Sequence, residues 1–227
     1  MPFLILARHG RTTANAAGVL AGRADGIGLD EHGAEQAREA GRRLEGVELA
    51  RFVSSPMQRC LETAALLLPE RDVEIDDRLT ECDYGDWTGG TLAELAKEPL
   101  WRTVQRQPSA VRFPGGEGMT QMSSRAIDVA RSLDREVAAT AGEHAVWLAV
   151  SHGDVIKAIL ADALGMHLDA FQRIGVNPAS LSLIHYGQHR ASVLAMNTNA
   201  GPLPIPAAPT EDAAVGGAPE APLGSPA

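Results

Sequence analysis

Two short apolar segments of this 227-residue chain each lead into a histidine followed by a glycine. Residues 4–7 lead into Arg8-His9-Gly10, and residues 146–150 lead into Ser151-His152-Gly153. Nearly continuous apolar runs are typical of strands that are buried on both faces of a sheet covered by helices. Because ligands bind outside the carboxyl ends of such strands, the pattern predicts that the two histidines lie together at a ligand site.

Helical patterns alternate with the other expected strands. Asp30 is the expected N-cap of a helix that runs to Leu44, and Ser55-Pro56 is the expected start of a helix that runs to about Leu68. Further helices are expected over 91–97, over 121–139 and up to Leu164. Further strands are expected over 51–54, 73–75, 181–186 and 192–196. Loops are expected over 81–90 and 108–118. This alternation predicts an α/β fold with a mainly parallel sheet between helical layers.

The composition changes at about residue 200. From there Pro, Ala and Gly dominate, Lys and Arg are absent, and the hydrophobic periodicity is lost. Such a segment cannot bury enough apolar surface to fold. We therefore expect one folded catalytic domain over residues 1–199 and a disordered tail over residues 200–227.

The charge and the apolar pattern limit the partners of this chain. A net charge of −9 disfavours binding to nucleic acids and to anionic membranes. The apolar run at residues 3–7 is too short for a signal peptide, and no run has the length of a membrane span, so we expect a cytoplasmic protein. Cys60 and Cys82 do not form a C-x-x-C motif, which disfavours a zinc or redox site. Apolar residues at the sheet edge are compatible with a homodimer without requiring one.

Two arginine residues follow expected strands, where ligands bind. Arg8 precedes His9, and Arg59 lies in the first turn of the helix expected after Ser55-Pro56. Backbone N–H groups at a helix N-terminus favour anions, and guanidinium groups bind phosphate oxygens through paired hydrogen bonds. Taken alone, Arg59 would be expected to pair at the surface with an acid such as Glu62. Beside the two histidines, we interpret it as part of a phosphate site.

Glu81 opens a loop that is rich in Gly and Asp. A carboxylate beside a bound dianion has a raised pKa and holds a proton near neutral pH, so Glu81 is a candidate acid for a leaving alcohol. Asp83 and Asp86 are rival acids, and a solvated surface position is the alternative for all three. With His9 as a neutral nucleophile on phosphorus and arginines on its oxygens, the set suits phosphoryl transfer followed by hydrolysis.

These residues resemble the histidine phosphatase superfamily, in its phosphoglycerate mutase-like branch. The resemblance covers about residues 3–196. It rests on ordered blocks, which are Arg8-His9-Gly10 with Thr12 and Asn15, Gly22-Arg23, Ser54-Ser55-Pro56 with Arg59 and Thr63-Ala64, Glu81 with Gly85, Trp87 and Gly89, Pro114-Gly115-Gly116-Glu117, and Ser151-His152-Gly153. It implies a three-layer α/β/α sandwich with one antiparallel edge strand, and a reaction that needs no metal and no other cofactor.

The resemblance also implies a role for each site residue. His9 would be the phosphorylated nucleophile, and Glu81 would be the proton donor. The substrate phosphate would be held by Arg8, Asn15, Arg59 and His152. The implied substrate is a small-molecule phosphate ester.

Phosphatase activity is favoured over mutase activity. Mutases of this family resemble one another in a longer insertion with an adjacent Arg-Arg pair. The corresponding segment 91–111 of this chain is short and carries only the separated Arg102 and Arg106. Arg11 and Gly118 depart from residues common in the family and affect the substrate rim. The prediction is hydrolysis of small phosphate monoesters through a phosphohistidine. A phosphoglycerate mutase-type reaction and a non-catalytic phosphate-binding protein are the alternatives. A metallophosphoesterase is disfavoured, because the sequence lacks the Asp- and Asn-rich set of metal ligands that such an enzyme needs.

Overall fold

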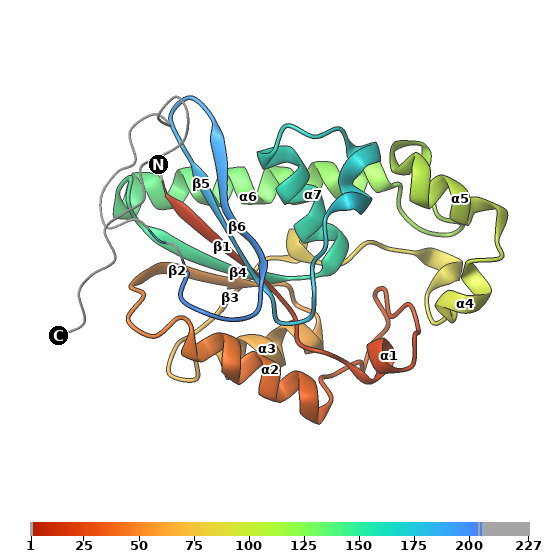
Figure 1. The fold of residues 1–227 in the computed structure, drawn as a ribbon, viewed down its shortest axis with the longest axis horizontal. Coiled ribbons are helices and arrows are strands. Elements are labelled where there is room, and N and C mark those ends of the chain that lie inside the picture. The colour runs from red at the N-terminus through yellow and green to blue at the C-terminus, as the bar shows by residue number, and fades with distance from the viewer. Residues whose placement is uncertain (1, 204, 206–227) are drawn as a thin grey trace.

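The computed structural model describes residues 2–203 and 205, which form one mixed sheet between helices (Figure 1). The strand order is β3-β2-β4-β1-β5-β6. The strands are β1 (Phe3–Arg8), β2 (Leu49–Ser54), β3 (Glu74–Ile75), β4 (Val146–Ser151), β5 (Leu181–Tyr186) and β6 (Ala191–Thr198). The predicted strands are thus confirmed, with boundaries that differ by one or two residues.

The sheet is mainly parallel, as predicted, and β5 is its one antiparallel strand. This strand lies next to the edge, because β6 pairs with its outer side and runs parallel to β1. A tight turn closed by the hydrogen bond from Gly187 N to Arg190 O (2.9 Å) joins β5 to β6. Only antiparallel neighbours can be joined by so short a turn, which explains why β6 runs antiparallel to β5.

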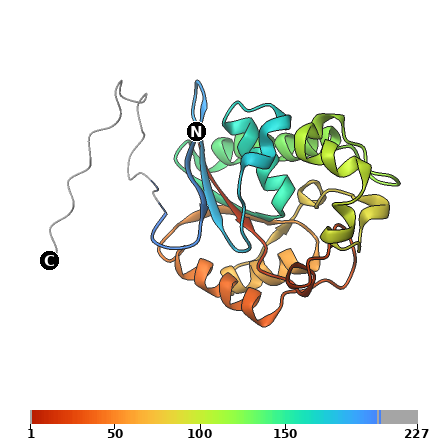
Figure 2. The same cartoon turned by 45° about the vertical axis from the view of Figure 1, so that its right-hand side comes forward.

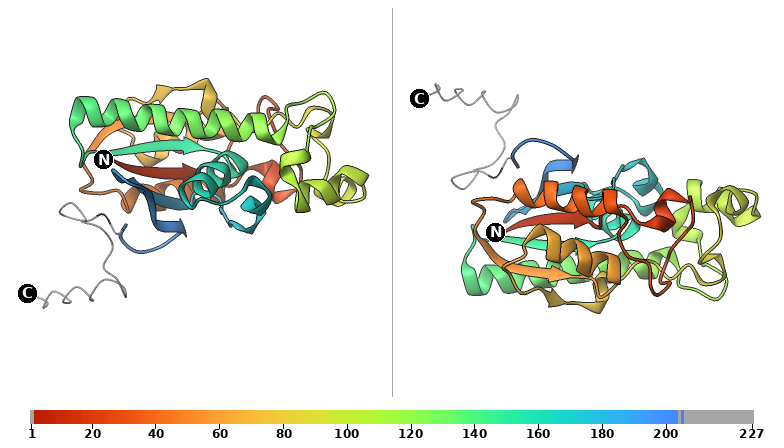
Figure 3. Two further views of the ribbon diagram at one scale, coloured as in Figure 1. Left: turned by 90° about the horizontal axis from the view of Figure 1, so that it is seen from above. Right: turned by 90° about the horizontal axis from the view of Figure 1, so that it is seen from below.

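Helices cover both faces of the sheet (Figures 1 and 3). One layer contains α2 (Glu31–Arg42) and α3 (Gln58–Leu67), and the other contains α6 (Met119–Ala141) and α7 (Gly153–Ala163). Phe3, Ile5 and Ala7 pack into the apolar cluster with α2 and α3, whereas Leu4 and Leu6 pack into the cluster with α6 and α7. Because successive side chains of a strand point to opposite faces, β1 is apolar along its whole length. The three-layer α/β/α sandwich is confirmed.

The first two long helices show how local chemistry places them. Asp30 caps α2 as predicted, because its Oδ1 accepts a hydrogen bond from Gly33 N at 2.7 Å. The predicted start of α3 at Ser55-Pro56 is wrong. The N-cap is Met57 and the helix begins at Gln58. The Ser55 hydroxyl lies 2.8 Å from His152 Nε2 and makes only a long contact of 3.4 Å with Met57 N, so it does not cap the first turn.

Short helices gather beyond the carboxyl ends of β1 and β4 (Figures 1 and 2). They are α1 (Thr13–Ala16), α4 (Leu92–Leu95) and α5 (Pro99–Arg106). The sequence predicted α4 but not α5, which begins with a proline at its first turn. The expected loops contain short 3-10 helices at Gly85–Trp87 and Pro108–Ala110. These segments form a cover over the end of the sheet where the histidines lie.

The end of the domain is held by Arg43. Its Nη1 donates to Thr198 O and its Nε donates to Gly201 O, both at 2.8 Å. Leu203 and Ile205 pack against the apolar cluster under α2 and α3. Residues 204 and 206–227, which make up most of the predicted tail, lie outside the described residues. Within the described part of the chain, no helix has the length and apolar character needed to cross a membrane.

Candidate active site

Parallel pairing of β1 with β4 brings the two histidine corners together. Arg8 lies opposite Ser151 in the register of the two strands, and His9 N donates to Ser151 O at 3.0 Å. The rings of His9 and His152 follow directly, with their centroids 5.3 Å apart. The predicted meeting of these two residues at the carboxyl end of the sheet is confirmed.

His9 is held as a neutral imidazole. Its Nδ1 lies 2.8 Å from Gly10 O. Because a carbonyl oxygen only accepts hydrogen bonds, Nδ1 carries the proton and Nε2 keeps a free lone pair. Burial lowers the pKa of His9 well below its usual value, and the positive charges of Arg8 and Arg59 lower it further. The geometry therefore presents an uncharged nucleophile.

The backbone beside His9 is fixed by close packing. Gly10 N donates to Thr63 Oγ1 at 3.0 Å, and the same hydroxyl donates to Arg59 O at 2.6 Å. A Cβ on Gly10 would lie 2.4 Å from Gly33 O, which explains why this position needs glycine. The contacts tie the backbone beside His9 to α2 and α3.

Two guanidinium groups with unused donors lie beside His9. Arg8 Nη1 donates to Val176 O at 2.6 Å, and Arg59 Nη2 donates to Gly22 O at 2.7 Å. The buried Arg8 Nε and the buried Arg59 Nε and Nη1 have no hydrogen-bond partner among the described residues. A buried unpaired donor is costly, so three such donors in one place favour an oxyanion as their ligand.

His152 lies behind Arg59 and is fully buried. Its Nδ1 lies 3.1 Å from Arg59 Nη2, and its Nε2 lies 2.8 Å from Ser55 Oγ. Since a guanidinium only donates, Nδ1 accepts and Nε2–H donates to the serine. Burial, together with the charge of Arg59, lowers the pKa of His152 well below its usual value. Both ring nitrogens are thus in use, and direct contact of His152 with phosphate stays a prediction.

Glu81 is the carboxyl group that the geometry favours as the acid. It is buried, and its Oε1 accepts a hydrogen bond from Cys82 N at 3.0 Å. Burial raises the pKa of Glu81 to about 7, and the negative charge of Asp154 adds to this rise. The rival Asp83 accepts from Gly85 N and faces Arg23, and the rival Asp86 is exposed. Only Glu81 of the three lines the cavity described next.

A cavity of about 380 Å³ lies at this end of the sheet. Asn15 lines it, and its Oδ1 accepts hydrogen bonds from Thr12 N and Oγ1, which leaves the amide N–H groups for a ligand. Two larger hollows elsewhere, of about 610 and 740 Å³, contain none of the predicted site residues. The structure therefore brings together in one cavity five of the six predicted residues, which are Arg8, His9, Asn15, Arg59 and Glu81.

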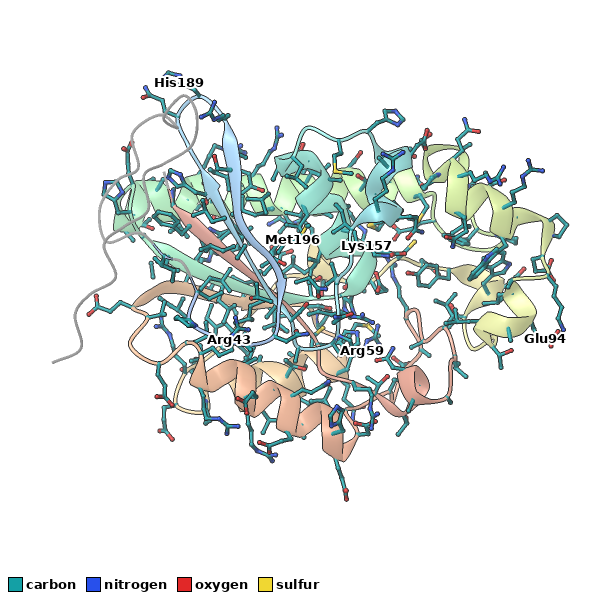
Figure 4. The ribbon with its side chains drawn as sticks, in the orientation of Figure 1. Arg43, Arg59, Glu94, Lys157, His189 and Met196 are labelled. Atoms are coloured by element: carbon teal, nitrogen blue, oxygen red, sulfur yellow. The ribbon has the colours of Figure 1, made fainter. Side chains whose placement is uncertain are left out.

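Three further polar residues that the sequence analysis did not select line the same cavity. Tyr84 Oη donates to Asp154 Oδ2 at 2.8 Å, and Lys157 Nζ lies 3.3 Å from Asp154 Oδ1. Figure 4 labels Lys157 of α7 and Arg59 of α3, which line the cavity from helices on opposite faces of the sheet. The position of Asp154 just after His152-Gly153 was a readable signal, whereas its pairing with Tyr84 depends on the fold. Within the described residues, no three His, Cys, Asp or Glu side chains are arranged to hold a metal ion.

Known proteins are similar to this chain in sequence and in fold. The model of the histidine phosphatase superfamily (branch 1) matches residues 4–199. A bifunctional protein of Mycobacterium tuberculosis is 35% identical over 205 residues, with 87% of this chain and 54% of that protein covered, so the chain spans about half the length of that relative. Phosphoserine phosphatase 1 of Hydrogenobacter thermophilus is 31% identical over 199 residues, with 86% and 91% covered. The solved structure of a mycobacterial glucosyl-3-phosphoglycerate phosphatase superposes with a TM-score of 0.75 at 29% identity, with 86% and 98% covered. The chain therefore belongs to the histidine phosphatase superfamily.

Proposed function

We propose that this protein is a phosphatase that hydrolyses small-molecule phosphate monoesters through a phosphohistidine at His9, without a metal ion. One observation carries the proposal. A neutral His9 with Nε2 available lines one cavity with Arg8 and Arg59, whose buried Nε donors have no partner among the described residues. A nucleophile and a site for the oxygens of the group that it attacks are thus present together.

The reaction has two steps. In the first, His9 Nε2 forms a bond to phosphorus while the ester P–O bond breaks, and Glu81 gives its proton to the leaving alkoxide oxygen. In the second, the Glu81 carboxylate takes a proton from water, the oxygen of that water bonds to phosphorus, and the N–P bond breaks to restore His9. Arg8 and Arg59 hold the phosphoryl oxygens through both steps.

The surroundings of the cavity support a phosphatase over a mutase. Arg102 and Arg106 lie on α5, are exposed, and do not line the cavity. They are therefore not placed to bind the carboxylate of a phosphoglycerate. The relatives named as phosphatases of phosphoserine and of glucosyl-3-phosphoglycerate also support hydrolysis of a small phosphate ester.

The decisive experiment measures phosphate release from p-nitrophenyl phosphate in the presence of EDTA. Wild-type protein is expected to release phosphate and to carry an acid-labile phosphoryl group on His9 after rapid quenching. His9→Ala is expected to abolish both, and His144→Ala, at an exposed histidine far from the cavity lining, is the matched control. A wild type without activity, or with phosphate on another residue, overturns the proposal. Conversion of 3-phosphoglycerate to 2-phosphoglycerate with its bisphosphate activator, faster than hydrolysis, would assign a mutase instead.

A further inference from the structure

Apolar side chains from three separate segments line the cavity that holds His9. We call this set the apolar mouth, and it consists of Val19, Leu20, Leu92, Ile174 and Val176. Leu92 is 42% exposed, although leucine is usually buried. Val19 and Leu20 are half-buried, and Ile174 and Val176 are buried in the adjoining core. Apolar side chains that line a cavity from several segments mark a place where an apolar part of a ligand is bound.

Backbone hydrogen bonds hold the apolar mouth in place. Leu20 N donates to Gly90 O at 2.9 Å, and Leu92 N donates to Gly18 O at 2.8 Å. Gly89 N donates back to Leu20 O at 2.8 Å, so the segments after α1 and before α4 form one wall. A ligand that packs against this wall does not have to order a loop, which favours its binding.

Two charged residues of the same cavity lining, Lys157 and Asp154, are paired with each other. Lys157 Nζ lies 3.3 Å from Asp154 Oδ1 and 3.0 Å from Gln172 Oε1, and Tyr84 also binds Asp154. A second anionic group on the substrate would meet the carboxylate of Asp154 beside the ammonium of Lys157. Besides the site residues, the cavity lining thus offers an apolar wall and a neutral ion pair, which favours an uncharged group on the substrate.

We infer that the alcohol of the substrate is uncharged and carries a bulky apolar or heteroaromatic body that packs against the apolar mouth. This inference rests on the proposed phosphatase function and names the substrate class of that site. The cavity volume of about 380 Å³ lies in the range of small-molecule sites, which is about 300–1,000 Å³. It holds such a body in addition to the phosphoryl group, and Lys157 and Asp154 are placed to bind hydroxyl groups of the same alcohol.

The test compares kcat/KM for pairs of esters whose leaving oxygens are chemically alike. The pairs are 2-phenylethyl phosphate with ethyl phosphate, adenosine 5′-monophosphate with ribose 5-phosphate, and 3-phosphoglycerate with glycerol 3-phosphate. We expect a preference of about tenfold or more for 2-phenylethyl over ethyl phosphate, as burial of an aromatic ring implies. The adenosine pair distinguishes a nucleoside-like substrate from a simple apolar alcohol. The carboxylate of 3-phosphoglycerate is expected to give no advantage.

Variants connect this preference to the apolar mouth. Leu92→Ser is expected to reduce the ratio of kcat/KM between 2-phenylethyl and ethyl phosphate by about fivefold or more, and Leu92→Met is expected to retain it. Leu164→Ser is the matched control, because Leu164 is 44% exposed and does not line the cavity. Since Leu92 is exposed, its replacement by serine leaves the fold intact.

The outcomes separate this inference from the proposed function. Equal kcat/KM for the first pair, a preference for 3-phosphoglycerate over glycerol 3-phosphate, or a ratio that Leu92→Ser does not change overturns the inference while phosphatase activity stands. Loss of all hydrolysis, including that of p-nitrophenyl phosphate, overturns the proposed function and the inference together.

Discussion

Arg59 Nη2 lies 3.1 Å from Nδ1 of His152, although 93 positions separate the two residues in the chain. The contact is fixed from behind, because Ser55 Oγ accepts from His152 Nε2 at 2.8 Å. The serine thereby sets the tautomer of the histidine, and the histidine orients the guanidinium group. We treat the three residues as one unit that aims the free donors of Arg59 at the phosphate site.

Loss of His152 is expected to disturb the orientation of Arg59. His152→Ala is expected to lower kcat/KM about a hundredfold, which is the effect of losing one oriented donor to the transition state. It is also expected to weaken inhibition by inorganic phosphate, because Arg59 loses its orientation. Steady-state kinetics and phosphate inhibition measure both effects. Ser55→Ala is expected to have the same effects to a smaller degree, and unchanged phosphate inhibition in both variants would show that the unit does not act on Arg59.

The pH dependence follows from Glu81. In the proposed mechanism Glu81 acts only while it is protonated, and its pKa is raised to about 7. Because this group must carry a proton in the first step, kcat/KM for alkyl phosphates is expected to fall about tenfold per pH unit above neutral pH. The pKa of His9 is lowered, so the nucleophile stays neutral across this range. A flat profile up to pH 9 would exclude Glu81 as the acid.

Asp154 is expected to set the pH at which kcat/KM begins to fall. Its negative charge raises the pKa of Glu81, so Asp154→Asn lowers that pKa and moves the fall in kcat/KM to lower pH. The measurement is a kcat/KM profile with an alkyl phosphate. Asp83→Asn serves as the control, because Asp83 faces Arg23 and does not line the cavity. An equal shift of this pH in both variants would contradict a specific effect of Asp154 on Glu81.

The acid also predicts a dependence on the leaving group. Glu81→Gln is expected to lower kcat/KM by about 10²–10⁴-fold for alkyl phosphates, whose oxygen needs a proton as it leaves. The loss is expected to be much smaller for p-nitrophenyl phosphate, because nitrophenolate leaves readily without a proton. The two substrates are compared in the same preparation. Equal losses would indicate that Glu81 acts on binding or folding instead.

Thr63 provides a prediction about stability. Its hydroxyl accepts from Gly10 N and donates to Arg59 O, and the residue is buried. Thr63→Val keeps the shape but leaves Gly10 N without its partner and removes the second hydrogen bond to Arg59 O, which costs about 1–3 kcal/mol of unfolding free energy. Urea unfolding monitored by tryptophan fluorescence measures the change. Thr63→Ser, which keeps the hydroxyl group, is expected to lose much less.

Local signals in the sequence predicted the framework of the fold well. The apolar runs of β1 and β4 and the Asp30 cap depend on neighbouring residues, and the structure confirms them. Ser55 was wrongly taken as a helix cap because its hydroxyl has a competing partner, His152, which the sheet brings from far along the chain. Helix α5 was missed because it has only eight residues, although its apolar and polar side chains separate clearly onto two faces.

The site could be predicted in its main groups for a similar reason. His9, Arg8 and Arg59 each lie at the end of a strand or in the first turn of a helix, where topology alone fixes their place. The pairing of Lys157 with Asp154 and Tyr84 depends on how α7 packs against a distant loop. The contact of Arg59 Nη2 with His152 Nδ1 likewise depends on side-chain orientations that cannot be read from a sequence pattern.

The central position of β1 has a consequence for synthesis of the protein. Ile5 pairs with Leu148 on one side and with Leu183 on the other, so both partners of β1 are translated long after it. The nascent chain therefore carries an apolar, unpaired segment until most of the domain has left the ribosome. Because His9 follows this strand directly, catalytic activity appears only when the sheet closes around it, and enzyme turnover becomes a late and sensitive reporter of complete folding.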